Sequence, residues 1–250
     1  MTQQVFGVIT LFPEIFSVLE YGVTGKILAR KLTKLLTWNL RDWALPYANQ
    51  VDDKPYGGGP GMVLKYQPLN DAILHAKKNM PALTKCIYLS PQGKTIKQKE
   101  LNAVVEQKTS LLFIAGRYEG IDERIIEQHV DEEWSIGEFV LTGGELAALA
   151  FIDGIFRLLP EGLGHPDSAR QDSFMHGLLD CPHFTRPAII ENKKVPEVLL
   201  SGNHQQIEQW RRKQALGITW LKRPDLLNSI VLDEIDKKLL VEYKQEHSMT

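Results

Sequence analysis

Cys86-Ile-Tyr-Leu-Ser-Pro-Gln-Gly93 is a short apolar run that ends abruptly in serine, proline and glycine. Two later runs share this design: Leu111-Leu-Phe-Ile-Ala-Gly-Arg-Tyr-Glu-Gly120 and Trp134-Ser-Ile-Gly-Glu-Phe-Val-Leu-Thr-Gly-Gly144. Such a run predicts a buried strand, and a glycine just past it allows main-chain groups to approach a bound molecule closely. We expect the three strand ends to share one crevice.

The surrounding segments alternate between strand and helix patterns. Thr24 is expected to cap the second helix, and Thr95 to form a capping box with Gln98 before the fourth. The alternation predicts an α/β domain with a mostly parallel sheet that ends near residue 160. Further strands are predicted at 5–10 and 35–40, and helices from Pro13, near Ile27, at about 67–79, from the Thr95 cap to about 107, and at about 121–129 and 144–158.

The chain changes character after residue 160. Residues 161–174 lack periodicity and are rich in turn formers, which predicts a flexible linker. Beyond it, Asn203 is expected to cap a helix that runs through Leu216 and ends at Gly217. Apolar residues four apart, Ile235, Leu239 and Tyr243, predict another helix. We therefore expect a small helical domain at 175–250, after a first domain at 1–160.

The composition is that of an ordinary soluble protein. Of the 250 residues, 43% are hydrophobic and 24% charged, and no apolar run approaches the roughly 18 residues of a membrane span. The start of the chain lacks signal-peptide features, and the two cysteines do not suggest a disulfide, so a cytoplasmic protein is expected. With a net charge of −2, any nucleic-acid site must be concentrated.

Two common nucleotide-binding motifs are excluded. Gly93-Lys94-Thr95 is like the end of a phosphate-binding loop, but Tyr88 stands where its first glycine is required. No GxGxxG follows the first predicted strand, which counts against a Rossmann dinucleotide site. Taken singly, each glycine-rich strand end is more often a tight turn than a binding element, and it is their coincidence that favours a ligand site.

Five motifs, in this order, resemble bacterial tRNA (guanine-N1)-methyltransferase over essentially the whole chain. This family belongs to the knotted (SPOUT) methyltransferases, so the resemblance implies a deep trefoil knot in the α/β domain, which binds S-adenosylmethionine in a bent shape. One departure is Ala147, where many members carry proline. The motifs are Pro55-Tyr-Gly-Gly-Gly-Pro-Gly-Met62, Tyr88-Leu-Ser-Pro-Gln-Gly93, Ala115-Gly-Arg-Tyr-Glu-Gly-Ile-Asp122, Ser135-Ile-Gly-Glu-Phe-Val-Leu-Thr-Gly-Gly-Glu145, and Asp172-Ser-Phe with Asp180-Cys-Pro-His-Phe-Thr-Arg-Pro187.

By this resemblance, the three strand ends form the pocket for S-adenosylmethionine. The implied activity is methyl transfer to N1 of the guanine just 3′ of the tRNA anticodon, a modification that maintains the reading frame. The implied pocket residues are Tyr88, Leu89, Ser90, Pro91, Gly116, Tyr118, Gly120, Ser135, Ile136, Gly137, Leu141, Gly143 and Gly144.

The resemblance also implies two catalytic side chains. Asp172 would be the general base that removes the N1 proton, and Arg157 would stabilise the charge that develops on O6. Each has a purely structural alternative. Asp172 could cap a helix at Asp172-Ser-Phe-Met, and Arg157 could be a cation that answers a helix C-terminus.

Contacts with the tRNA are expected from basic side chains and from a glycine-rich loop. The alternative is that the basic cluster at 211–223 is a solvated helix face, with the nearby Trp210 and Trp220 in a core. Cys181 and His183 are interpreted as structural. The candidate contacts are Gly58, Gly59, Lys94, Arg186, Arg211, Arg212, Lys213, Lys222 and Arg223.

The family further implies Mg²⁺ dependence and a homodimer in which one subunit completes the pocket of the other. Glu119 is a weak candidate for a metal ligand, since no sequence spacing reveals a binding set. Two other functions stay open on the sequence: a knotted ribose 2′-O-methyltransferase acting on rRNA or tRNA, and a non-catalytic RNA-binding regulator.

Overall fold

The computed structural model describes residues 3–163 and 171–248, which divide into two units at residues 166 and 167. Half of the linker predicted at 161–174, residues 164–170, lies outside the described residues. Its described parts, 161–163 and 171–174, form turns and bends without helix or strand. Each unit has a hydrophobic core of its own.

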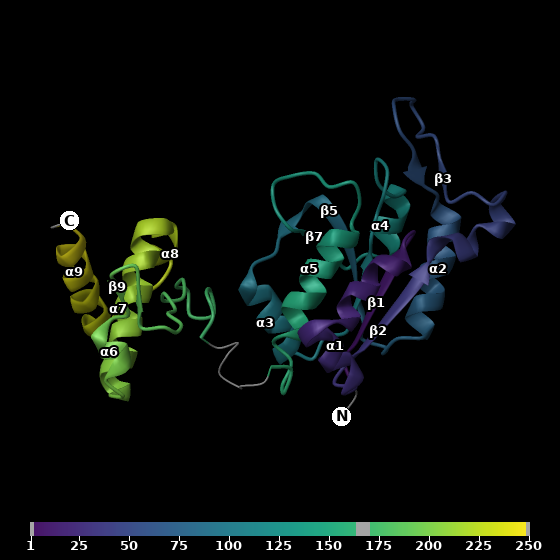
Figure 1. Cartoon of the computed structure of the whole chain (residues 1–250). Helices are drawn as coiled ribbons and strands as arrows, with labels where there is room; N and C mark the ends of the chain where they lie inside the picture. Colours follow the sequence, from purple (N-terminus) through teal and green to yellow (C-terminus); the bar gives the residue numbers. More distant parts are fainter. Residues whose placement is uncertain (1–2, 164–170, 249–250) are drawn as a thin grey trace. The chain divides into compact units, whose positions relative to one another are not determined.

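A five-stranded parallel sheet organises the first unit (Figure 1). The strand order is β2-β1-β6-β5-β7, and every neighbouring pair is parallel. This arrangement confirms the α/β class predicted from the alternation of elements. The strands are β1 (Val5–Thr10), β2 (Lys34–Asn39), β5 (Lys85–Thr95), β6 (Leu111–Ile114) and β7 (Glu132–Ser135).

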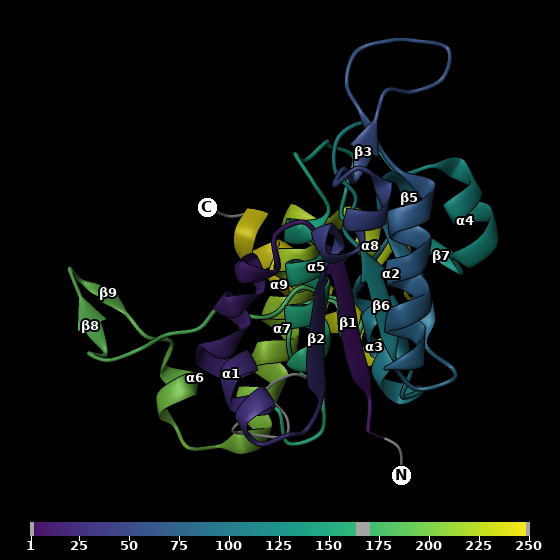
Figure 2. The ribbon, with the colours of Figure 1, turned by 90° about the vertical axis from the view of Figure 1, so that its right-hand side faces the viewer.

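Helices cover both faces of this sheet, as Figure 2 shows from its edge. Alternate strand residues point to opposite faces, so Phe6 and Val8 pack on one side while Val5 and Ile9 pack on the other. Burial of both faces explains why the strands are continuous apolar runs. One face carries η1 (Pro13–Glu20), α1 (Gly22–Ala29), α3 (Gln98–Glu106) and α5 (Glu145–Phe156); the other carries η2 (Leu40–Trp43), α2 (Tyr66–Lys78) and α4 (Glu123–His129).

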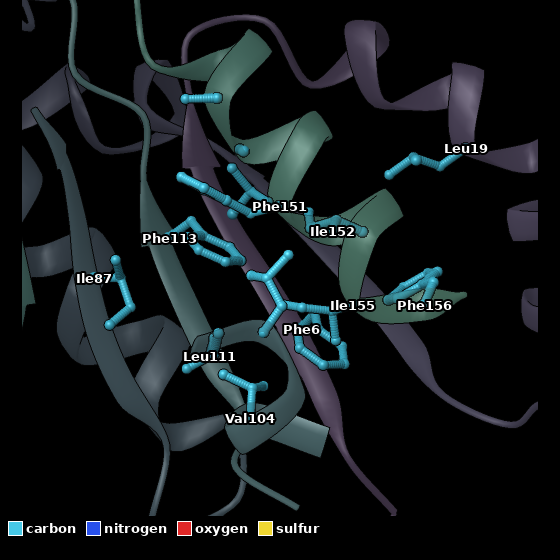
Figure 3. Close-up of a cluster of buried hydrophobic side chains, with 14 of the residues drawn as sticks. Phe6, Leu19, Ile87, Val104, Leu111, Phe113, Phe151, Ile152, Ile155 and Phe156 are labelled. Atoms are coloured by element: carbon cyan, nitrogen blue, oxygen red, sulfur yellow. The ribbon is translucent and has the colours of Figure 1, made fainter. Parts of the chain in front are cut away.

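Aromatic side chains fill the core between α5 and the sheet (Figure 3). The rings of Phe6 and Phe156 meet edge to face with centroids 5.4 Å apart, and those of Trp134 and Phe151 meet in the same way at 5.4 Å. Burying one such side chain contributes about 2–3 kcal/mol. This packing holds the middle and the end of α5 against the sheet.

The second unit is built on α7 (His204–Lys222) and α9 (Glu234–Ser248), which pack through Leu216, Leu239 and Leu240. The predicted cap at Asn203 is confirmed, because its side chain accepts a hydrogen bond from the Gln206 N–H at 3.2 Å. The remaining elements are the hairpin β8 (Ile189–Ile190) and β9 (Lys193–Lys194), α6 (Glu197–Leu200) and α8 (Pro224–Leu227).

Gly217 does not end α7, which continues for five more residues to Lys222. A Cβ at Gly217 would lie 2.2 Å from Cγ of Tyr243, so this glycine allows α7 and α9 to approach closely. The prediction of a helix end at Gly217 was therefore wrong. The glycine serves packing, which outweighs its poor helix propensity.

Two other local predictions were also wrong, and the helix predicted at Ile235, Leu239 and Tyr243 is confirmed as α9 except for the burial of its first residue. Thr24 lies inside α1, where its hydroxyl donates to the Tyr21 carbonyl, and Tyr21 is the N-cap. The capping box of α3 is formed by Lys97 and Glu100, because β5 runs on to Thr95. Ile235 is 64% exposed, so the apolar face of α9 is carried by Leu239, Leu240 and Tyr243.

Replacing Gly217 by alanine tests the close packing of α7 on α9. Helix propensity alone would stabilise the protein by about 0.5–1 kcal/mol, whereas overpacking against Tyr243 should destabilise it by about 1–3 kcal/mol. We expect destabilisation, measured by urea unfolding followed by circular dichroism. Gly154→Ala in α5 is the control, since its Cβ meets only the end of the Leu101 side chain. A Gly217→Ala protein more stable than the parent would contradict this packing.

Candidate active site

A pocket of about 280 Å³ lies where β5, β6 and β7 end. Ligands of open α/β sheets bind at this carboxyl edge. The wall is formed by the three glycine-rich strand ends and the first turn of α5. Its residues are Tyr88, Leu89, Ser90, Pro91, Gly116, Arg117, Tyr118, Glu119, Gly120, Trp134, Ser135, Ile136, Phe139, Val140, Leu141, Thr142, Gly143, Gly144 and Ala147.

Backbone hydrogen bonds hold the pocket loops together. The Gly144 N–H donates to the Gly116 carbonyl at 2.9 Å, and Arg117 forms an antiparallel bridge with Gly143. A Cβ at Gly144 would lie 2.9 Å from the Ala115 Cα, so only glycine allows these two loops to meet. The loops are thus joined through their main chains, independently of most side chains.

A bulge in β5 shapes another wall of the pocket. Leu89 and Lys94 are both paired with Trp134 of β7, so the four residues between them leave the strand. Gly93 ends this bulge, where a Cβ would lie 2.5 Å from the Glu133 main chain. Ser90 and Pro91 are thereby placed at the pocket.

Twelve of the thirteen residues expected at the donor pocket line this one pocket. Gly137 is the exception. Its N–H donates to the Ser135 hydroxyl at 3.2 Å, and the Phe139 ring lies against it, so Phe139 takes its place in the wall.

The sequence prediction did not include seven residues of the wall among the donor-binding residues. Arg117, Glu119, Phe139, Val140 and Thr142 lie inside the quoted motifs, so their positions in the loops were the available signal. These seven are Arg117, Glu119, Trp134, Phe139, Val140, Thr142 and Ala147.

Glu145, at the start of α5, is the most buried ionisable group at the pocket, with 1% exposure. It accepts a hydrogen bond from the Thr10 hydroxyl at 2.9 Å, and its Oε2 lies 3.0 Å from Nε of Arg117. The Arg117 guanidinium also lies over the Phe12 ring at 4.6 Å. A buried carboxylate requires such partners, and here they join the end of β1, α5 and the pocket loop.

Tyr88 contributes a neutral hydroxyl to the pocket. Burial, and then the nearby Glu133 carboxylate, raise the pKa of Tyr88 to about 12. The side chain therefore remains protonated across the physiological range and acts as a hydrogen-bonding and apolar wall. It does not act as a base.

The glycine-rich loop at 54–62 is anchored on the pocket segment. It connects β3 (Asp52–Asp53) to β4 (Val63–Leu64), two very short strands that were not predicted. The Met62 carbonyl accepts from the Glu119 N–H at 2.9 Å, and a Cβ at Gly61 would meet the Glu119 side chain. Gly58 and Gly59 are exposed, and both lie outside the pocket wall.

Arg157 lies at the far end of α5 from this pocket. The pocket contacts the first turn of α5, and Arg157 follows its last residue. The twelve residues of α5 span roughly 20 Å at 1.5 Å per residue. The first unit therefore does not bring Arg157 to its own pocket. Asp172 belongs to the second unit, where residues 171–177 form bends and turns, so it does not cap a helix.

The basic residues of the cluster at 211–223 differ in their pairing. Arg212 donates to Asp236 at 2.8 Å, and Lys213 lies 2.7 Å from Glu246. These contacts join α7 to α9, a structural use that neither the tRNA-contact prediction nor its solvated-face alternative included. Arg223 pairs with Asp225 at 2.9 Å, Lys94 of the first unit pairs with Glu100 at 2.9 Å, and Lys222 is exposed.

Glu119 does not belong to a cluster of potential metal ligands. Within residues 3–163 and 171–248, such a cluster of three or more groups occurs only at Asp180, Cys181 and His183. The Asp180 carboxylate already bonds the His183 ring at 2.8 Å and the Cys181 N–H at 2.7 Å. Burial raises the pKa of the Cys181 thiol, which agrees with a structural role.

The parallel sheet and the glycine-rich pocket at its strand ends define an α/β protein with a candidate ligand site at the carboxyl edge of the sheet. The family model described as tRNA (Guanine-1)-methyltransferase TrmD matches residues 4–229. The chain therefore belongs to this family of methyltransferases, which is part of the SPOUT superfamily. The family assignment confirms the resemblance seen in the five motifs.

Close relatives cover almost the whole chain. A tRNA (guanine-N(1)-)-methyltransferase of Legionella pneumophila is 64% identical over 241 residues, 96% of each chain. A protein of the same name from Pseudomonas putida is 55% identical over 96% of each chain. One from Vibrio campbellii is 54% identical over 97% of this chain and 98% of its own.

Among the described residues, none of the helices is long and apolar enough to span a membrane.

Removing the Glu145 carboxylate tests whether it supports the pocket loops. Glu145→Leu leaves Arg117 without its carboxylate, and we expect the free energy of unfolding to fall by about 2 kcal/mol. The double variant Glu145→Leu with Arg117→Met should recover part of this loss, as a double-mutant cycle in urea would measure.

The exposed pair between Arg30 and Glu161 provides the control. Glu161→Leu should cost less than about 1 kcal/mol, because exposed ion pairs contribute little. Equal losses for Glu145→Leu and Glu161→Leu would refute a supporting role for the buried pair.

Proposed function

We propose that this chain is a cytoplasmic enzyme that transfers a methyl group from S-adenosylmethionine to N1 of the guanine just 3′ of the tRNA anticodon. The observation that carries the proposal is the pocket at three parallel strand ends, in a chain that belongs to the tRNA (Guanine-1)-methyltransferase family. Transfer of a labelled methyl group to unmodified tRNA, followed by nucleoside analysis, tests it. A label on a ribose oxygen, or no label, would overturn it.

The pocket fits the proposed donor in its chemistry. Main-chain N–H and C=O groups of the loops at 116–120 and 141–144 can read an adenine edge, while Leu89, Ile136 and Leu141 supply apolar surface. Glycines at 116 and 144 keep the cradle open, since a Cβ at Gly116 would lie 2.9 Å from the Tyr88 ring. When bound, the donor supplies an activated methyl group on its sulfonium.

Asp172 is the proposed general base. The lone pair of guanine N1 becomes available only when the N1 proton leaves, so a carboxylate positioned at that proton accelerates transfer. Asp172 lies in a segment of bends and turns at 171–177 of the second unit. Arg157 would then stabilise the negative charge that spreads to O6.

A homodimer explains how Arg157 and Asp172 reach a pocket. Arg157 is separated from the pocket of its own chain by the length of α5, roughly 20 Å. We propose that Arg157 and Asp172 of one copy complete the pocket of the other copy, where the anticodon loop binds. We further propose that the pocket segment forms the trefoil knot of its superfamily.

Mg²⁺ would bind at this pocket as a hydrated ion. Glu119 is the carboxylate at the pocket wall that could contact it, and such ions often bind through one or two carboxylates plus water. The side chains at the pocket do not form a metal cage, so no step of the reaction is assigned to the ion.

Asp172→Asn should lower guanine methylation by at least about a hundredfold, the scale of a lost general base. The affinity for S-adenosylmethionine, measured by calorimetry, should stay within a few fold. Glu234→Gln removes an exposed carboxylate of α9 in the same unit and should leave both values unchanged. Near-normal turnover by Asp172→Asn would refute its role as the base.

Gly144→Val should abolish donor binding, because its side chain would push the Gly116 loop away from α5. Calorimetric titration with S-adenosylmethionine measures this loss. Ala150→Val introduces the same side chain at an exposed position of α5 and should bind the donor normally. Unchanged binding by Gly144→Val would contradict the pocket assignment.

Mixing the Asp172→Asn and Gly144→Val proteins extends this test to the homodimer. Each variant lacks one half of the proposed site. In mixed dimers one pocket would be complete, so about a quarter of the parental activity should return after subunit exchange. No recovery would contradict a pocket shared between copies.

A further inference from the structure

A second pocket, of about 440 Å³, lies within the second unit. It opens between the extended segment 182–188 and the helices α6 and α7. We propose that this pocket binds one nucleotide of the tRNA other than the methylated guanine, with the phosphate on Arg186 and Arg211. The inference rests on the proposed function. The wall is Pro182, His183, Phe184, Thr185, Arg186, Ala188, Val195, Leu199, Leu200, Ile207, Trp210 and Arg211.

The proposed phosphate contact is supported by which basic side chains of this unit already form ion pairs and which do not. Neither Arg186 nor Arg211 forms an ion pair with the other residues of 3–163 and 171–248. Their basic neighbours Arg212, Lys213 and Arg223 are all paired with carboxylates of the same unit. Two guanidinium groups that lack internal partners therefore converge on one pocket, from separate elements.

The charged side chains that line this pocket favour an anionic ligand. No aspartate or glutamate contributes to the wall, and His183 at its edge is held by Asp180 at 2.8 Å. A guanidinium presents a rigid fork of N–H donors that matches the oxygens of a phosphate. In a chain with a net charge of −2, two unpaired arginines in one pocket are a concentrated site for a polyanion.

Aromatic rings beside the arginines provide a surface for a base. The Phe184 and Trp210 rings are in contact, with centroids 6.2 Å apart, and Phe184 is 48% exposed. Val195, Leu199 and Ile207 extend this apolar wall. Cationic groups next to exposed aromatic rings are the combination that binds unstacked nucleotides, where the base stacks and the phosphate is neutralised. An inorganic anion alone would leave the aromatic wall unused.

The test compares tRNA binding by single and double variants of the full chain. Arg186→Gln and Arg211→Gln should each weaken binding of unmodified tRNA about tenfold, measured by fluorescence anisotropy. Each should also flatten the dependence of log Kd on log salt by about one unit, the expected effect of one lost phosphate contact. The double variant should lose less than the product of the single losses, because both side chains contact one phosphate.

Phe184→Leu separates the base from the phosphate. It should weaken tRNA binding by about tenfold while leaving the salt dependence unchanged, since stacking on a ring involves no counterion release. Lys237→Gln is the charge-matched control, because Lys237 is an exposed cation of α9 paired with Glu234. It should bind tRNA like the parent, and all variants should bind S-adenosylmethionine normally.

The two proposals fail in different ways. If the parent protein methylates guanine N1 but Arg186→Gln and Arg211→Gln bind tRNA with unchanged affinity and salt dependence, the second pocket is not a nucleotide site. A changed oligomeric state of these variants with normal tRNA affinity would overturn the inference and assign the pocket to a contact between copies. Failure of the parent to methylate tRNA would instead remove the proposed function.

Discussion

Burial of both faces of a parallel sheet is the constraint on which the first unit depends. Helices occupy both faces, so the strand ends are the part of the sheet that a small ligand can reach. At the carboxyl edge the strands open into loops, and their N–H and C=O groups are no longer used by the sheet. The three glycine-rich strand ends are the residues that turn this edge into a pocket.

The buried carboxylate of Glu145 extends this constraint from the backbone to charge. Desolvation of an ionised group costs several kcal/mol unless partners replace the lost water. Thr10 and Arg117 are those partners, and they come from β1 and from the loop after β6. One group thereby ties three separate elements together beside the pocket. A chain that paired Glu145 wrongly would leave either the carboxylate or the guanidinium without a partner.

The sequence was a good guide where a residue's environment is local, and a poor guide where it is set by distant residues. The apolar runs at 86–90 and 111–114 predicted buried strands because exposing such a run to water is unfavourable, and the motifs at their ends supplied most of the residues that line the strand-end pocket. Gly217 was misread because its reason is Tyr243, which lies 26 residues later and on another helix. Thr24 is a residue type that commonly caps helices, but α1 already begins at Gly22, with Tyr21 as its N-cap. The partners of Arg212 and Lys213 were equally invisible, since no local spacing identifies Asp236 or Glu246.

The pairing of charges also explains how a weakly acidic chain can serve RNA. Most basic side chains of the cluster at 211–223 are paired: Arg212 and Lys213 with carboxylates of α9, and Arg223 with Asp225. Counting lysines and arginines therefore overestimates the charge that a ligand would meet. An arginine that already donates to a carboxylate gains little from a phosphate, because one charge-assisted contact merely replaces another. Arginines without such partners gain the full contact. Candidate RNA-binding cations of this unit are therefore better selected by the absence of an ion pair than by how many lie together in the sequence. Within the described residues, Arg186 and Arg211 meet that criterion.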